Sequence, residues 1–191
     1  MHRRIRSISA CASVCLALAA ALACAPRSQR EAIAMAENAY YEDRCKGVLV
    51  RLEQARIMSS KPLEREPRRM EVECSMAIED AEVAEEKLYD LCEDFDWSRD
   101  GVAIAVIKKA AVYPVNQAAR EVDGYVQLGL EIGDDGRVEY ARILASEPAT
   151  FFDSAARKAV MKWRYCPKRF LPVDTRWPKT AEMRFKLPVL R

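Results

Sequence analysis

The sequence feature that most constrains the fold is a pair of strand patterns joined by a tight turn in the C-terminal half of the chain. In residues 126–132 apolar side chains alternate with Gln, Gly and Glu, which is the period of a strand buried on one face. Residues 134–136 are Asp-Asp-Gly, which favour a chain reversal because Asp tolerates turn geometry and Gly adopts positive φ without steric cost. A second strand pattern begins at Val138. The segment therefore predicts an antiparallel β-hairpin.

The second strand of this hairpin changes phase along its length. Val138 is in phase with one face of the strand, whereas Ala141 and Ile143 are in phase with the other. A β-bulge inserts one extra residue and so reverses the alternation. We therefore expect a bulge near Tyr140.

An amphipathic helix is predicted after the hairpin, over residues 150–164. Thr150 and Asp153 have the spacing of a helix N-cap. Apolar residues then recur at helical spacing, at Phe152, Ala156, Ala159, Val160 and Trp163. We expect this stripe to pack on the sheet with Trp163 largely buried, together with a shorter helix at residues 115–122. The solvated face is expected to carry Arg157, Lys158, Lys162 and Arg164.

A third strand is predicted at residues 180–187 and ends before Pro188. Its inward side chains are expected to be Ala181, Met183, Phe185 and Leu187. As the last element it is expected at the sheet edge, where unpaired N–H and C=O groups can accept an added strand. The expected partner-binding residues are Thr180, Glu182, Arg184, Phe185 and Lys186. The alternative is a protected edge, because outward Arg184 and Lys186 also repel unwanted strands.

These C-terminal residues resemble the C-terminal domain of the TonB family, the periplasmic module that carries inner-membrane energy to outer-membrane receptors. The resemblance covers roughly residues 108–191 and rests on short motifs in a fixed order. They are Tyr113-Pro114, Ala118, Gly124-Tyr125-Val126, Gly136-Arg137-Val138, Ile143-Leu144 with Ser146, Phe152-Asp153 with Ala155-Ala156, and Trp163-Arg164-Tyr165 followed by Pro167. The resemblance implies a domain that pairs a sheet strand with an extended receptor segment.

Two apolar stripes at helical spacing precede this domain. The first follows a capping box of Ser28 and Glu31 and consists of Tyr41, Cys45, Val48, Leu49 and Leu52. The second is separated from it by Pro62 and Pro67 and consists of Met70, Cys74, Ala77, Ile78, Ala81, Leu88, Cys92 and Phe95. We expect each stripe to form one continuous helix and the two helices to form an antiparallel hairpin.

The patterns together predict the α+β class. A helical hairpin is followed by a TonB-C-like domain, in which an antiparallel sheet of about three strands packs with two helices. The expected boundaries are an export signal at residues 1–24, the helical hairpin region at 27–98, a linker at 99–107 and the TonB C-terminal-like domain at 108–191.

The first residues of the chain are typical of an export signal. Arginines among residues 1–6 precede an almost wholly small and apolar run at residues 8–25. Cleavage after Ala23 and lipidation of Cys24 are both open, and we favour the lipoprotein. A retained membrane anchor is the third outcome, because the run measures about 27 Å at about 1.5 Å per residue, barely a bilayer core.

A retained anchor is what a TonB-like transducer needs. In the family that anchor carries a Ser and a His that engage a proton-driven motor, whereas the only histidine here is His2, outside the apolar run. The long Pro-rich spacer of the family is also missing. These differences favour a module that is not coupled to the motor.

Four of the seven cysteines follow the export signal: Cys45, Cys74, Cys92 and Cys166. An even number in an oxidising periplasm indicates disulfides, with buried free thiols as the alternative. On one continuous helix Cys74 and Cys92 would lie about 27 Å apart and could not pair. If the first helix ends near Met58 and the second begins near Pro62, Cys45 and Cys74 lie 13 and 12 residues from the turn and face each other. We expect these two to pair and Cys92 to pair with Cys166, although a free Cys166 remains open. A zinc site is disfavoured because there is no CxxC pair and no histidine after the signal.

The composition argues against several classes of function. The chain has 31 basic and 29 acidic residues, a near-neutral balance that does not suit a nucleic-acid surface. It lacks a Gly-rich phosphate loop, a G-x-S-x-G motif and paired carboxylates in an apolar context, so we expect no enzyme, no catalytic residue and no cofactor. The Asp-Asp-Gly segment is explained more simply as a turn than as a calcium loop, so no metal site is expected.

Two functional classes remain. The first is a TonB-like periplasmic protein linked to energy-dependent outer-membrane transport, which binds receptor segments by strand addition. The alternative is a periplasmic lipoprotein or exported binding module that is not coupled to an inner-membrane motor. In either class the expected partner is an outer-membrane receptor or other envelope protein, and a homodimer is left open. The expected location is the periplasm, with attachment to the membrane by a lipid or by the N-terminal segment.

Overall fold

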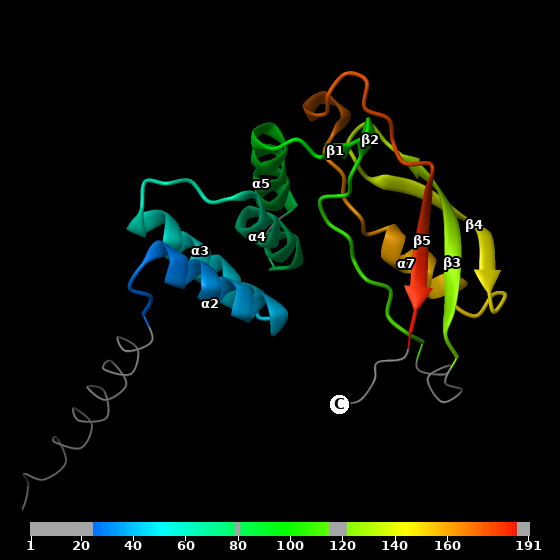
Figure 1. Ribbon diagram of the computed structural model, residues 1–191, viewed down its shortest axis with the longest axis horizontal. Helices are drawn as coiled ribbons and strands as arrows, with labels where there is room; N and C mark the ends of the chain where they lie inside the picture. Colours follow the sequence, from blue (N-terminus) through cyan, green and yellow to red (C-terminus); the bar gives the residue numbers. More distant parts are fainter. Residues whose placement is uncertain (1–24, 79–80, 115–121, 187–191) are drawn as a thin grey trace, which may run out of the picture. The chain divides into compact units, whose positions relative to one another are not determined.

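The computed structural model describes residues 25–78, 81–114 and 122–186 (Figure 1). The chain divides into two compact units, Met1–Met70 and Glu71–Arg191. The predicted export signal at residues 1–24 lies outside the described residues, as does nearly all of the helix predicted at residues 115–122.

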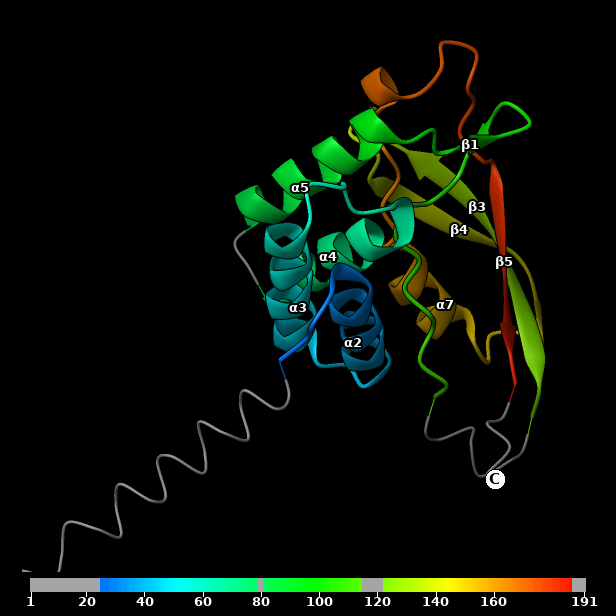
Figure 2. The same cartoon turned by 60° about the vertical axis from the view of Figure 1, so that its left-hand side comes forward.

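The first unit is built on a pair of helices, α2 (Gln29–Tyr41) and α3 (Cys45–Met58), which lie side by side in Figures 1 and 2. The predicted cap is confirmed, because Ser28 Oγ accepts a hydrogen bond from Glu31 N–H at 3.2 Å. Small and aliphatic residues are buried on both helices: Ala32, Ala36, Ala39, Val48, Leu52 and Ala55. A Cβ placed on Gly47 would lie 3.3 Å from the Ala39 Cβ, so the two backbones pack closely.

The prediction of one continuous helix over the first stripe is therefore wrong. The chain reverses after Tyr41, where Asp43 has a φ of 55°, a left-handed conformation that ends a right-handed helix. Folding back buries the small faces of both helices against each other. A straight helix would leave those faces in water. Tyr41, which the pattern placed on the buried stripe, is 85% exposed.

The second stripe is also divided, into α4 (Arg65–Ile78) and α5 (Ala81–Asp94). Lys87 Nζ of α5 donates a hydrogen bond to Ser75 Oγ of α4 at 3.0 Å. On one continuous helix these residues would be about 18 Å apart, since each residue rises by about 1.5 Å. The expectation of a single second helix is therefore wrong. Division lets the apolar residues Leu88, Leu91 and Cys92 of α5 join the core of the second unit.

The second unit is organised around a three-stranded antiparallel sheet, as predicted. Its strands are β3 (Gly124–Ile132), β4 (Val138–Glu147) and β5 (Thr180–Phe185), in the order β4-β3-β5. A smaller sheet pairs β1 (Ser98–Arg99) with β2 (Val102–Ala103). One helix, α7 (Asp153–Val160), and a short 3-10 helix, η1 (Lys168–Phe170), complete the described elements of the unit (Figure 2). The predicted α+β class is confirmed.

The predicted hairpin turn and bulge are both present. Gly133 N–H bonds to Arg137 O at 2.9 Å, and Gly136 has a φ of 81°. Glu131 lies opposite Tyr140 while the next residue, Ile132, lies opposite Val138, so β4 carries one extra residue beside Tyr140. A second register shift falls between Gln127 and Leu128. The phase change in the sequence therefore marks the first of two bulges.

Helix α7 is shorter than predicted at both ends. Its N-cap is Phe152 without a side-chain hydrogen bond, while Thr150 has a φ of 65° and its N–H bonds to Ser146 Oγ at 3.2 Å. Capping by Thr150 is therefore wrong. After Val160 the chain turns, and Arg164 exchanges two backbone hydrogen bonds with Ile107, at 3.0 and 3.1 Å. This pairing ends the helix early because it draws residue 164 into an extended bridge.

Trp163 is buried as predicted, but in this bridge and not on a helix. It is 8% exposed, and its Nε1 donates a hydrogen bond to Lys109 O at 3.0 Å. The residues expected to form a linker are also part of the core, since Ala103, Ala105, Val106 and Ile107 are buried. The second compact unit thus extends well before residue 108.

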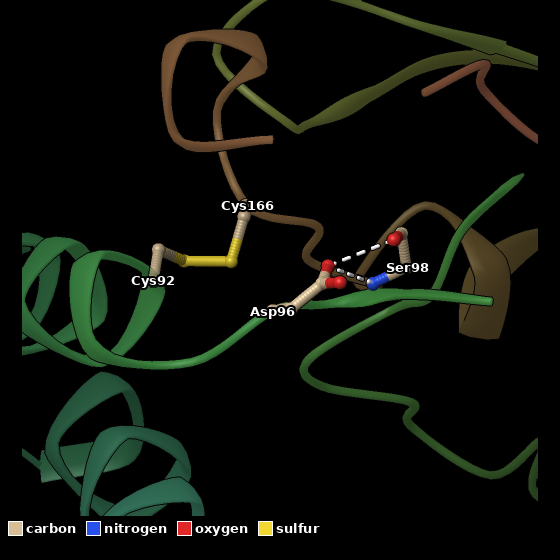
Figure 3. The surroundings of a disulfide bond; sticks show 4 residues. All are labelled: Cys92, Asp96, Ser98 and Cys166. Atoms are coloured by element: carbon tan, nitrogen blue, oxygen red, sulfur yellow. Dashed lines mark hydrogen bonds between the residues drawn. A yellow bond between two sulfur atoms is a disulfide. The ribbon is translucent and has the colours of Figure 1, made fainter. Parts of the chain in front are cut away.

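A disulfide joins α5 to the chain that follows the bridge. Cys92 and Cys166 are bonded, with their Cα atoms 5.6 Å apart and 74 residues apart in sequence (Figure 3). They are the two cysteines that the sequence analysis pairs, and both belong to the second unit. Just after α5, Asp96 Oδ1 accepts hydrogen bonds from Ser98 N–H at 2.9 Å and Ser98 Oγ at 2.7 Å, which shape the turn into β1. The pairing of Cys45 with Cys74 stays a prediction.

Replacing Trp163 with Ala should lower the free energy of unfolding by about 3–5 kcal/mol, because a large aromatic side chain is removed from the core. Urea unfolding followed by circular dichroism measures the change. Met161→Ala is a suitable control, because Met161 is 37% exposed. A loss below about 1 kcal/mol for Trp163→Ala would contradict the packing described here.

Removing the disulfide with the double variant Cys92→Ala and Cys166→Ala should lower the free energy of unfolding by about 2–4 kcal/mol. The reason is that the bond closes a long loop in the unfolded chain. Unfolding of oxidised protein with and without the substitutions measures the difference. Peptide mapping without reduction checks the bond itself, and recovery of both cysteines as free thiols would show that it does not form.

Candidate functional site

The candidate site is the outer edge of β5. Thr180, Glu182 and Arg184 are exposed, and Lys186 is exposed just beyond the end of the strand. Phe185, which was included among the partner-binding residues, is only 3% exposed and faces the core. The structure therefore gathers four of the five predicted residues at the edge and gives Phe185 a supporting position beneath it.

One hydrogen bond fixes which backbone groups of β5 face outward. Leu130 N–H bonds to Lys179 O at 2.9 Å, in the register that also places Gly129 opposite Thr180. Bonded and non-bonded residue pairs alternate along an antiparallel ladder. The residues of β5 that bond to β3 are therefore Ala181, Met183 and Phe185. Those whose N–H and C=O groups point away from β3 are Thr180, Glu182 and Arg184.

The outward groups of β5 are available for pairing within the described part of the chain. The three-stranded sheet ends at β5, and no described strand pairs with its outer side. The ladder between β3 and β5 is regular over six residue pairs, with no register shift. The opposite edge of the sheet, β4, carries two register shifts. Bulges twist an edge away from regular pairing, so β5 is the edge better suited to an added strand.

An open hollow lies beside this edge on the outer face of the sheet. Cross-strand neighbours Tyr125 and Arg184, and Gln127 and Glu182, contribute to its lining. Its other lining residues are Asp123, Gly124, Phe185 and Lys186. Arg184 Nε bonds to Glu182 Oε1 at 2.8 Å, so these two exposed charges are paired along the strand. The hollow thus offers an aromatic surface flanked by charges of both signs.

A cluster of aromatic rings supports the edge from inside. The rings of Phe152 and Phe185 are stacked, with centroids 4.3 Å apart and planes 11° from parallel. Tyr113 contacts both rings edge-on, at 5.3 Å from Phe152 and 6.4 Å from Phe185. A Cβ on Gly124 would lie 2.2 Å from Glu147 O and 2.6 Å from the Phe152 ring, so only glycine fits there. The cluster therefore holds the C-terminal end of β5 in place on the core.

Tyr113, Gly124 and Phe152 belong to separate motifs in the sequence, and no common position was predicted for them. The structure brings them together beneath the end of β5. No spacing in the sequence indicates this, because the three residues come from different segments of the chain.

Two groups with shifted pKa values, Arg164 and Tyr165, lie near the β3–β4 turn and away from the edge. Burial raises the pKa of Tyr165 to about 12, so this phenol is protonated at neutral pH. Burial also lowers the pKa of the Arg164 guanidinium, as does nearby Arg137, while Glu85 and Asp135 oppose the change. Arg137 itself is paired with Glu85 and Asp135. The ion pair between Arg137 and Glu85 therefore joins the hairpin turn to α5.

None of the described helices is both long enough and apolar enough to cross a membrane. Within the same residues, no group of three or more His, Cys, Asp or Glu side chains is placed to hold a metal ion.

The C-terminal part of the chain matches the family model described as the Gram-negative bacterial TonB protein C-terminal, over residues 109–187. Protein TonB of Escherichia coli strain K12 is 32% identical over 63 residues, which cover 33% of this chain and 26% of that protein. Protein TonB of Pseudomonas aeruginosa is 39% identical over 57 residues, which cover 30% of this chain and 17% of that protein. The chain thus spans about a quarter or less of the length of these curated relatives.

A solved structure titled as the solution NMR structure of the Pseudomonas aeruginosa TonB CTD is also similar. It is 29% identical with a TM-score of 0.37, and the match covers 46% of this chain and 88% of that one. The assignment of the family rests on the sequence matches, which fall on the segment that contains the β5 edge and its aromatic support. Residues 109–187 are thereby identified as a TonB C-terminal domain.

Proposed function

We propose that this chain takes part in energy-dependent transport across the outer membrane, and that its TonB C-terminal domain binds an extended segment of an outer-membrane receptor by strand addition at β5. The observation that carries the proposal is the row of outward N–H and C=O groups at Thr180, Glu182 and Arg184 on a regular sheet edge. An added strand would satisfy these groups by the same alternation that joins β5 to β3.

The hollow beside the edge supports the same proposal. Alternate side chains of an added strand point to the two faces of the sheet, so those on the outer face would meet Tyr125 and Arg184. The aromatic ring offers a surface for an apolar side chain, and the basic groups of Arg184 and Lys186 suit an acidic one. Backbone pairing provides most of the contact, so the site tolerates varied receptor sequences.

The substitution Arg184→Pro should weaken binding of an extended receptor peptide by about tenfold or more, because it removes an outward N–H donor and places a ring in the pairing direction. Arg184→Ala is the matched control, since it keeps the N–H and removes only an exposed side chain paired with Glu182. Its effect should stay within about threefold, as expected for an exposed ion pair. Fluorescence anisotropy with the full chain and a labelled peptide measures both.

Both variants must first show the circular dichroism spectrum and urea midpoint of a folded protein. Equal affinity of the folded Pro and Ala variants would rule out pairing through β5. Arg184 is a suitable position for Pro because its N–H does not bond to β3 in this register, so the existing ladder is preserved.

We further propose that the chain acts in the periplasm and is held at the membrane by a lipid on Cys24. Ala21, Leu22 and Ala23 precede this cysteine and resemble a loose lipidation motif. The retained N-terminal anchor is the competing arrangement, and it is the one that a motor-coupled transducer would use.

Intact mass spectrometry of protein purified from the cell envelope should show a chain that begins at Cys24 and carries a diacylglyceryl group. The variant Cys24→Ala should lose that added mass and leave the membrane fraction, because one attachment point is removed. A chain that begins at Met1, or an unmodified Cys24, would contradict the lipid anchor. Neither result bears on strand addition at β5, which the peptide-binding experiment tests separately.

A further inference from the structure

A second hollow in the Glu71–Arg191 unit lies between the chain at residues 109–114 and helix α7. It measures about 710 Å³, and both of its walls consist of described residues. The residues that matter for its chemistry are Lys109, Val112, Phe151, Ala155, Lys158 and Lys162. The hollow therefore combines an apolar floor with three ammonium groups. It shares no lining residue with the hollow at β5.

Among the described residues, only one of the three lysines in this hollow has a carboxylate partner. Lys109 Nζ forms an ion pair with Glu73 Oε1 at 2.5 Å. Lys158 and Lys162 are exposed, and among the described residues no carboxylate lies within ion-pair distance of either one. Two neighbouring cations without a counter-ion on a concave surface attract an anionic ligand.

The opposite wall presents a free backbone. Residues 109–114 belong to no helix or strand, and Lys109 O accepts the Trp163 indole hydrogen bond. In the described part of the chain the backbone groups of Ala110, Ala111 and Val112 make no hydrogen bond. A stretch of chain outside the helices and strands, with N–H and C=O groups that bond to no other described residue, favours a peptide as the ligand, because the backbone of a peptide can bond to these groups.

The spacing of the two lysines selects the kind of peptide. Lys158 lies on α7, and Lys162 lies in the turn just after Val160, where its N–H bonds to Ala159 O at 3.0 Å. The two residues are therefore about one helical turn apart, or about 6 Å. In an extended peptide the side chains at i and i+2 point to one face and lie about 6.7 Å apart. Carboxylates two residues apart therefore match the two ammonium groups, and the CH₂ stems of glutamate can lie on Ala155 and Phe151.

We propose that the groove between residues 109–114 and α7 binds an extended acidic segment of a partner protein, with two carboxylates at i and i+2 on Lys158 and Lys162. A membrane surface carrying anionic headgroups has the same charge, but it is flat, whereas this site is concave and its apolar side chains form a floor. The groove is a separate peptide site from the β5 edge and does not depend on the function proposed for that edge.

The test uses the full chain and a labelled peptide of sequence Thr-Thr-Glu-Thr-Glu-Thr-Thr, in which β-branched residues favour an extended backbone. The permuted peptide Thr-Thr-Glu-Glu-Thr-Thr-Thr has the same charge with adjacent carboxylates on opposite faces. Anisotropy titrations at low salt should give about fivefold weaker binding for the permuted peptide, because it can place only one carboxylate on the lysines.

The double variant Lys158→Gln and Lys162→Gln should bind the first peptide about fivefold more weakly than the unsubstituted chain. The control variant Lys46→Gln and Lys179→Gln removes the same charge from exposed positions outside the groove and should bind as the unsubstituted chain does. Arg184→Pro should also leave this binding unchanged, which separates the groove from the β5 edge.

Equal loss of binding in the Lys46 and Lys179 control would show only a general effect of net charge and would overturn the proposal. Equal binding of the two peptides by the unsubstituted chain would overturn it as well. A third experiment measures whether the chain sediments with phosphatidylglycerol vesicles. Vesicle binding that depends on Lys158 and Lys162, in the absence of peptide binding, would assign the surface to a membrane and end the peptide proposal.

Discussion

The stacked pair of Phe152 and Phe185 is the contact on which the C-terminal domain most depends. It joins the residue before α7 to the last residue of β5, and it requires the space left by Gly124 at the start of β3. Three segments distant in sequence are held at one point by this contact. Among the described strands β5 pairs with β3 alone, so its position relies on the inward packing of Phe185 and Met183 more than the position of a central strand would. The edge that we propose for receptor binding is thus supported from within the core.

The helical part of the second unit extends this core beyond the TonB-like segment. Leu88, Leu91 and Cys92 of α5 are buried in the same cluster as Trp97 and Ile107. Around them lie the Cys92–Cys166 disulfide, the ion pair of Lys109 with Glu73 and the stacking of Arg169 over Tyr89 at 4.8 Å. A small domain gains stability from such additions, because its own core is limited by its size. The same helices leave β5 and the lysine groove uncovered within the described unit, so stabilisation and binding use different surfaces.

The two proposed sites show how one domain can offer extended peptides different chemistry. At β5 the backbone provides the contact and the charges are largely paired, so sequence preference should be weak. In the groove Lys158 of α7 and Lys162 just after it have no carboxylate partner among the described residues, so preference should depend on carboxylate spacing and on salt. Lys158 and Lys162 were predicted to lie on a solvated face, and both are exposed. The wall opposite them, formed by residues 109–114, could not be predicted because those residues have no periodic pattern.

The elements that could be predicted from the amino-acid order alone are those with local sequence signals. Alternation in residues 126–132 and the Asp-Asp-Gly turn determined the hairpin, the phase change at Ala141 determined a bulge, and the inward Met183 and Phe185 determined the third strand. Tertiary structure decided where the helices end. Each of the two apolar stripes was predicted as one helix, but each is divided between two helices where the chain folds back. An apolar stripe indicates that one face of a helix is buried, but it does not indicate which other element covers that face. Likewise, an apolar pattern predicts that Trp163 is buried both for a helix and for an extended bridge. The two backbone hydrogen bonds between Ile107 and Arg164, which form only in the folded protein, end the helix before Trp163.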